Sequence, residues 1–209
     1  MKEVIDLRKD LKNKFEEVMG DYKDDLEIQF LSLSCMTRDI VDGTVSDMMT
    51  LDIISLVLGF VIVWLFIRQV SLLIISVVNL AESLLISFAI SYFLTFSIDI
   101  PSFAEAIQSA TVIALTFDYS LFLFSNVRLN LRNGENPRTI VRNMLGSSGH
   151  VVLVSGFCLA LTFAFQCICP VDIIISIGVC TALTIIIIML VSLTNTAAML
   201  SLFPKFFLH

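Results

Sequence analysis

The chain has 209 residues, of which 57% are hydrophobic and 15% are charged, whereas soluble domains carry about 25% charged residues. Residues 1–50 hold 7 of the 13 Lys/Arg and 12 of the 19 Asp/Glu, so most of the net charge of −6 lies there. This composition excludes a disordered chain, a nucleic-acid binder with a basic face and a disulfide-stapled secreted module. It indicates a polytopic membrane protein with a small polar head.

The polar head, residues 1–47, is too small to fold well alone. Apolar residues recur every three or four positions over 4–22, which predicts an amphipathic helix, and alternate over 26–30, which predicts a strand. One helix and one strand cannot bury a core. We therefore expect an α+β remnant of an extracytoplasmic domain, in a chain that is a piece of a longer protein. A complete five-span protein with a translocated tail is the alternative.

Five later segments are apolar over the roughly 20 residues that a spanning helix needs. They are 48–67, 70–96, 103–126, 148–168 and 173–203. The four prolines, Pro101, Pro137, Pro170 and Pro204, fall at or beyond the ends of these segments, where proline is expected. Residues 48–209 are therefore predicted to form an all-α domain of five transmembrane helices.

The orientation of the spans follows from Lys and Arg, which concentrate in cytoplasmic loops. The turn after the first span, the loop after the third and the C-terminus hold six such residues, and the other two loops hold none. These residues are Arg68, Arg128, Arg132, Arg138, Arg142 and Lys205. We therefore expect a cytoplasmic C-terminus, an extracytoplasmic N-terminal segment and a place in the plasma membrane.

Two carboxylates lie inside predicted spans, where a charge costs on the order of 3 kcal/mol and usually serves a function. Asp118 lies about 12 Å from the cytoplasmic end of the third span, and Tyr119 follows it directly. A carboxyl group in apolar surroundings beside a hydroxyl can load and release protons, so the pair suggests a proton relay. Glu82, near the midplane of the second span, and Asn79, one turn away, are accessory candidates.

Polar stripes on three consecutive spans are predicted to converge on a hydrated interior path. Ser155, in the fourth span, is expected at the depth of Asp118. Ordinary interhelical hydrogen bonding, worth about 0.6 to 2 kcal/mol per pair, is the alternative. In chain order the stripes are Gln108, Thr111, Asp118 and Ser125, then Ser148, Ser155, Thr162 and Gln166, then Thr181, Thr184, Ser192 and Asn195.

Two stretches resemble a known family: FDYSLFLFSNVRLNLRNGENP, from position 117, and GSSGHVVLVSGFCLALTF, from position 146. They are similar to the conserved pattern of MMPL transporters, within the resistance–nodulation–division (RND) superfamily that also holds Patched-like proteins. The likeness covers nearly the whole chain. It implies the second to sixth spans of one RND half, preceded by the end of its extracytoplasmic porter domain.

The resemblance implies export of lipids or other hydrophobic molecules, driven by the proton-motive force. In the family an Asp-Tyr pair on the fourth span relays protons beside a Ser on the fifth, roles that carry over to Asp118, Tyr119 and Ser155. A full transporter has two such halves, so this chain would need a second half or a second copy as partner. Membrane lipids and the hydrophobic substrate are its other expected partners.

The chain departs from the family pattern after the third span, where Asn126, Leu129 and Asn130 replace an Arg and two Glu. This leaves open a degenerate or specialised copy, and the first span that the resemblance expects but the chain lacks leaves open a truncated product without function. A second alternative is a lipid-binding, sterol-sensing-like regulatory domain, which has the same five-span extent. No enzyme activity, cofactor or metal is expected, because the cysteines and histidines lack ligand spacing and no phosphate-binding glycine loop is present.

Overall fold

The computed structural model describes residue 14 and the ranges 33–67, 70–96 and 100–204, and this part of the chain is all-α. Its helices are α2 (Leu33–Ile67), α3 (Val70–Leu94), α4 (Ser102–Arg132), α5 (Pro137–Met144), α6 (His150–Ala164) and α7 (Asp172–Leu202), with a π-helical turn η2 (Leu145–Gly149) before α6 and a 3₁₀ turn η3 (Phe165–Ile168) after it. The predicted helix over 4–22, apart from residue 14, and the predicted strand over 26–30 lie outside the described residues. Arg68 and Lys205 lie outside them too.

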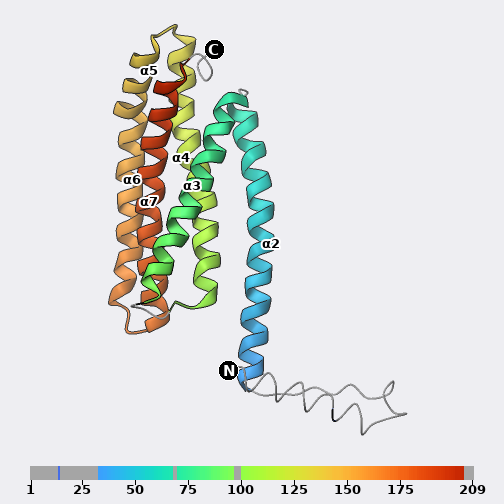
Figure 1. Cartoon of the computed structure of the whole chain (residues 1–209). Helices are drawn as coiled ribbons and strands as arrows, with labels where there is room; N and C mark the ends of the chain where they lie inside the picture. The colour runs from blue at the N-terminus through green and yellow to red at the C-terminus, as the bar shows by residue number, and fades with distance from the viewer. Residues whose placement is uncertain (1–13, 15–32, 68–69, 97–99, 205–209) are drawn as a thin grey trace, which may run out of the picture. The chain divides into compact units, whose positions relative to one another are not determined.

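Five of the described segments are long and apolar enough to cross a membrane, so the predicted number and order of spans are confirmed. They are Ile40–Ile67, Ser71–Leu94, Phe103–Arg132, Pro137–Ile168 and Asp172–Leu202. Consecutive spans run in alternate directions (Figure 1), as in a multi-pass membrane protein.

The first and fourth spans begin earlier than predicted. The first starts at Ile40 rather than at 48, and the fourth helical segment starts at Pro137 rather than at 148. Pro137 occupies the first turn of α5, where its missing N–H costs nothing. Ile140 and Met144 then pack into the core, which extends the helix through a stretch too polar to be predicted as membrane-spanning.

The chain divides into two compact units, Met1–Gly43 and Thr44–His209. The second unit holds α3 to α7 and most of α2. A boundary between residues 47 and 48, expected from composition, stays a prediction.

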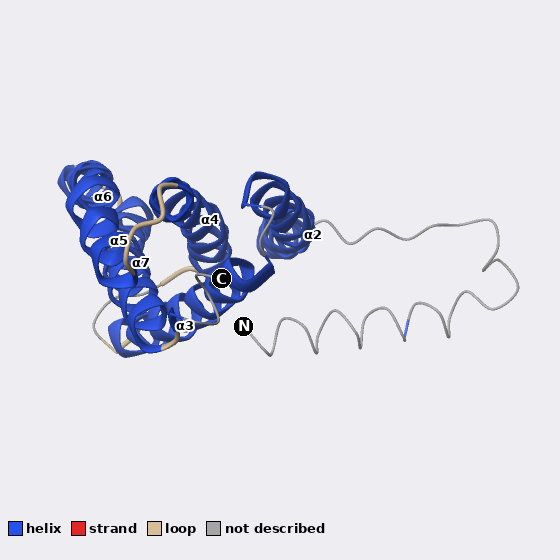
Figure 2. Ribbon diagram, turned by 90° about the horizontal axis from the view of Figure 1, so that it is seen from above, coloured by secondary structure: helices blue, strands red, loops and turns tan. Residues whose placement is uncertain are grey.

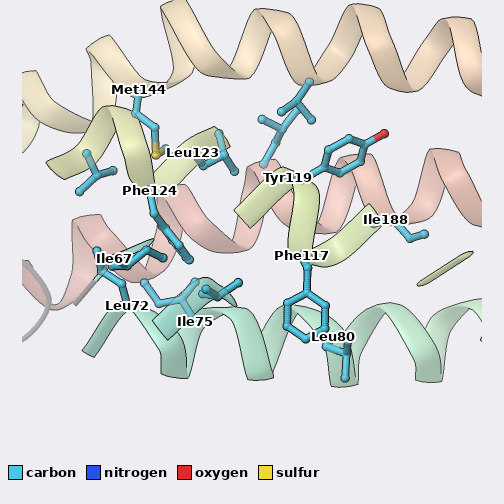
Figure 3. Packing of buried hydrophobic residues seen from close by; sticks show 14 of the residues in the cluster. Ile67, Leu72, Ile75, Leu80, Phe117, Tyr119, Leu123, Phe124, Met144 and Ile188 are labelled. Carbon is cyan, nitrogen blue, oxygen red and sulfur yellow. The ribbon is translucent and has the colours of Figure 1, made fainter. Parts of the chain in front are cut away.

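Helix α7 lies at the centre of the second unit, where it contacts α3, α4 and α6 (Figure 2). Its small and polar residues explain how three helices fit around it, because Gly, Ser and Thr let helix backbones approach closely. The apolar core cluster draws on α3, α4 and α5. There Leu72, Ile75, Leu123, Phe124 and Met144 are fully buried (Figure 3).

Helix α2 packs on α4 through few residues. The rings of Phe60 and Phe117 meet edge to face at 4.9 Å, and Gly59 admits the Phe117 ring, which a larger side chain would displace. Ser109 donates a hydrogen bond to the Asp52 carboxylate. Only 11% of the most apolar stretch of this span is buried, so the remaining surface of α2 is available to lipid.

The turn from α4 to α5 explains one glycine of the sequence pattern. Gly134 has a φ of +71°, in the left-handed region that glycine adopts without a steric cost. Its N–H donates to the Leu131 carbonyl at 3.0 Å, which ends α4 and turns the chain back toward α5.

Candidate functional site

Asp118 and Tyr119 lie in the middle of α4, on different faces. Successive residues of an α-helix are rotated by about 100°, so the two side chains leave the helix in different directions. Tyr119 is 4% exposed, whereas the Asp118 side chain is exposed. Figure 3 shows Phe117 and Tyr119 leaving α4 toward different neighbouring helices.

Asp118 belongs to a face of α4 that the described residues leave uncovered. Ala110, Ala114 and Phe122, spaced four residues apart on either side of it, are exposed as well, and so is Ser125. Two of these residues are alanines, so the backbone of α4 is accessible along this face. Among the described residues, Asp118 therefore does not point into the interior path on which the polar stripes could have converged.

The predicted polar stripe of α4 divides between two faces. Gln108 is 2% exposed and lies inside the bundle, whereas Asp118 and Ser125 lie on the uncovered face. A step of three residues turns back by about 60° and a step of seven by about 20°. From Gln108 to Asp118 these rotations add to about 80°, and to Ser125 they add to about 100°. This is enough to place Gln108 on a different face from Asp118.

The Tyr119 hydroxyl lies directly against the backbone of α6. A methyl group added at Gly156 would lie 2.9 Å from Tyr119 Oη and 2.9 Å from Met189 Sδ, both inside normal van der Waals contact. The absence of a side chain at Gly156 therefore creates the space for the Tyr119 hydroxyl. The Ser-Gly pair of the sequence pattern thus positions the tyrosine through its glycine.

Ser155, the third predicted relay residue, is exposed. Its hydroxyl donates to the Val152 carbonyl of its own helix at 3.3 Å. The structure thus places Ser155 next to the residue that contacts Tyr119, while no hydrogen bond joins Ser155 to Asp118 or Tyr119 among the described residues.

The two accessory candidates on α3 differ in their surroundings. Asn79 is fully buried; its Nδ2 donates to Thr196 Oγ1 at 3.0 Å, and its Oδ1 accepts from Asn195 Nδ2 at 2.7 Å. Asn79 therefore joins α3 to α7. Glu82 is half-buried, and no hydrogen bond or ion pair reaches it from the described part of the chain.

A second interhelical connection lies at the opposite end of α3. Ser91 donates to Gln108 Oε1 at 2.9 Å, and Gln108 Nε2 donates to Thr184 Oγ1 at 2.8 Å. The predicted stripe on α7 is thus used inside the bundle, since Thr184 and Asn195 take part in these bonds. The sequence interpretation named Asn79 of α3 but missed the serines that share its face. Ser76, Asn79, Ser83, Ser87 and Ser91 recur at helical spacing and would have revealed a polar face.

Asn126 and Asn130, two of the positions that depart from the family pattern, belong to a network of amide side chains at the end of α4. Asn126 donates to Ser147 Oγ at 2.8 Å, and Asn130 donates to Asn126 Oδ1 at 2.6 Å. Asn143 donates to Asn130 Oδ1 at 3.3 Å and to Glu135 Oε2 at 2.9 Å. Amide side chains therefore join α4, α5 and η2 where the family pattern has charged ones.

Arg128, which matches the pattern, contacts a different helix. Its Nη1 donates to the carbonyl oxygen of Phe66 at 2.6 Å. Phe66 lies in the last turn of α2, whose carbonyls lack helical partners and attract a cation. Arg128 thus attaches the end of α2 to α4.

Groups of His, Cys, Asp and Glu that could hold a metal ion were not found within the described ranges. Cys158, Cys167, Cys169 and Cys180 are free thiols.

Comparison with known proteins gives one family. The model of the MMPL family matches residues 9–208, which is nearly the whole chain. A search of curated proteins found no match.

Proposed function

Because the chain belongs to the MMPL family, a family of transporters and not of enzymes, we propose that it is one half of a proton-driven exporter of lipids or other hydrophobic molecules. Asp118 carries the proton in this proposal, Tyr119 adjoins it, and Ser155 lies on the neighbouring helix.

The observation that carries the proposal is the carboxyl group of Asp118 on an uncovered face in the middle of a span. Lipid is a poor neighbour for it, because a charge at the centre of a spanning helix costs on the order of 3 kcal/mol. A protein partner that covers this face would remove the carboxyl group from lipid and bring it to a second polar surface. Proton uptake and release would then take place at the contact between the two halves.

The small residues beside Asp118 support the same partner. Ala110 and Ala114 allow a second helix to approach the backbone of α4 closely, as small residues do at helix contacts in membranes. The partner is a second RND-type half or a second copy of this chain.

In the proposed topology the protein lies in the plasma membrane. Its C-terminus is cytoplasmic, and its N-terminal segment is extracytoplasmic. This topology rests on the arginines that crowd the end of α4 and the start of α5, Arg128, Arg132, Arg138 and Arg142.

The test is Asp118→Asn in the full transporter assembly, purified from membranes and reconstituted into liposomes with a pH-sensitive dye inside. The amide keeps the size and polarity of the side chain but cannot exchange a proton, so we expect loss of substrate-dependent proton flux with normal insertion. Glu105→Gln is the matched control, because Glu105 is an exposed acid in the first turn of the same helix. Unchanged proton flux in Asp118→Asn would refute the proposal, and loss in both variants would assign the effect to α4 as a whole.

A further inference from the structure

The interior of the bundle contains a column of buried polar side chains that the proposed proton site does not use. On α3 it consists of Ser76, Asn79, Ser83, Ser87 and Ser91, each at most 7% exposed. Facing residues on α4 and α7 are equally buried, namely Gln108, Thr116 and Ser120 on α4, and Thr184, Ser192 and Thr196 on α7.

The hydrogen bonds fix the register of these three helices. Ser91, Gln108 and Thr184 are bonded to one another and form one layer. Helix α3 runs opposite to α4 and α7 (Figure 1). Residues that lie the same number of positions before Ser91 on α3, after Gln108 on α4 and after Thr184 on α7 are therefore at the same depth in the bundle. Twelve positions lead to Asn79 and Thr196, and these are bonded at 3.0 Å, which confirms the register.

A middle layer follows from the same register. Eight steps from the first layer lead to Ser83 on α3, Thr116 on α4 and Ser192 on α7. Each of the three side chains is fully buried, and none of their hydroxyl oxygens has a hydrogen-bond partner among the described residues. One hydroxyl from each of three helices therefore lies at this depth without a partner.

The unpartnered hydroxyls continue on both sides of the middle layer. Ser87 lies one turn along α3 toward the first layer, and Ser120 lies one turn along α4 toward Asn79. Both side chains are at most 1% exposed and both hydroxyls lack a partner within the described ranges. Between the two layers held by amide side chains, the buried polar side chains of α3, α4 and α7 are all hydroxyls, and Ser120 lies at the depth of the Asn79 layer.

Water is the ligand that fits this chemistry. Buried polar groups in proteins are nearly always hydrogen-bonded, and lipid offers no partner. A buried water makes about three hydrogen bonds, which the three hydroxyls of the middle layer can supply because each both donates and accepts. The oxygens of this layer are neutral, whereas bound cations in proteins usually have carboxylate or carbonyl ligands.

We propose that Ser83, Thr116 and Ser192 together bind a buried water molecule, and that Ser87 and Ser120 extend it into a hydrated column that reaches the depth of Asn79. The column is separate from Asp118. Thr116 and Ser120 each lie two residues from Asp118, a rotation of about 200°, and they are buried where Asp118 is exposed. Helix α4 therefore has a wet interior face and a carboxylate on its other face.

The experiment is water-edited solid-state NMR on the isotopically labelled full chain in lipid bilayers, in which magnetisation passes from water to nearby carbons. We expect early transfer to the β-carbons of Ser83, Thr116 and Ser192. Leu72 is the control, because it is fully buried in the apolar core cluster of α3, outside the column. Transfer to the three hydroxyl residues no faster than to Leu72 would overturn the proposal.

A double variant distinguishes one water shared by the three hydroxyls from separate waters bound at each of them. Thr116→Val keeps the size of the side chain, Ser192→Ala shortens it by the hydroxyl oxygen alone, and together they remove two of the three hydroxyls. Together they should abolish the early transfer to Ser83, although Ser83 itself is unchanged. The control Ile188→Val should leave that transfer intact. Persistent transfer to Ser83 in the double variant would overturn the shared site, and the retained spectrum of the apolar core would show that the variant is folded.

Discussion

Replacing Gly156 with alanine tests whether the close contact of Tyr119 with α6 positions the tyrosine. The added methyl group would lie 2.9 Å from Tyr119 Oη, 2.9 Å from Met189 Sδ and 3.3 Å from Met189 Cγ. Comfortable contact lies near 3.5 to 4.0 Å, so the two atoms at 2.9 Å must each move by roughly 0.6 to 1 Å. Methionine is flexible and can adapt. The displacement therefore falls on the tyrosine, whose ring is buried.

The expected net destabilisation is about 1 kcal/mol. Overpacking a well-packed site costs about 1 to 3 kcal/mol, and alanine recovers roughly 1 kcal/mol relative to glycine through its higher helix propensity. The measurement is reversible unfolding by SDS titration in mixed micelles. The Tyr119→Phe background supplies the decisive comparison, because it removes the oxygen that the methyl group meets.

In that background Gly156→Ala should lose most of its penalty, or become stabilising. Gly146→Ala serves as control, since a methyl group there meets nothing within 4 Å. If Gly156→Ala destabilised the chain equally with and without the Tyr119 hydroxyl, the close contact would not be the cause. The positioning role of Gly156 would then be refuted.

Two further changes test the contacts that join the helices. Asn79→Leu should destabilise the bundle by about 1 to 3 kcal/mol in the same SDS titration. The change removes two interhelical hydrogen bonds and leaves Thr196 and Asn195 without that partner. A change below the error of the titration would contradict the role of Asn79 as a link between α3 and α7. Arg128→Gln should cost up to about 1 kcal/mol, because a neutral side chain interacts more weakly with the Phe66 carbonyl and the end of α2. Faster proteolysis between α2 and α3 would report the same loss, and an unchanged digestion rate would argue against it.

The spans could be predicted from the sequence because long apolar segments have few alternatives. Their number and order depend on hydropathy alone, and these were correct. The start of α5 was missed because Arg138, Arg142 and Asn143 make that stretch polar on average. What extends the helix there is the burial of Ile140 and Met144, which depends on neighbours that a linear pattern does not contain.

The site residues remain a prediction, and the direction in which Asp118 points was not predictable from the sequence. Asp118 and Tyr119 follow from residue type, depth and the family pattern. Which way Asp118 points depends on which face α7 and α3 cover, and only the packing decides that. The serines of α3 were overlooked for a different reason: serine is weakly polar and common in apolar helices, so a run of it lowers the hydropathy little. Its regular spacing was the informative signal.

The packing of the fourth span depends more on the number of residues in the π-helical turn η2 than on which residues they are. Buried residues recur every four positions through the turn, at Ile140, Met144, Ser148, Val152, Gly156 and Ala160. In an unbroken α-helix each such step drifts by about 40°, and the wider π turn reverses part of that drift. Deleting a single residue within 145–149 would rotate α5 by about 100° relative to α6 and turn Ile140 away from the core. Homologous chains should therefore exchange side chains in this stretch more readily than they gain or lose a residue.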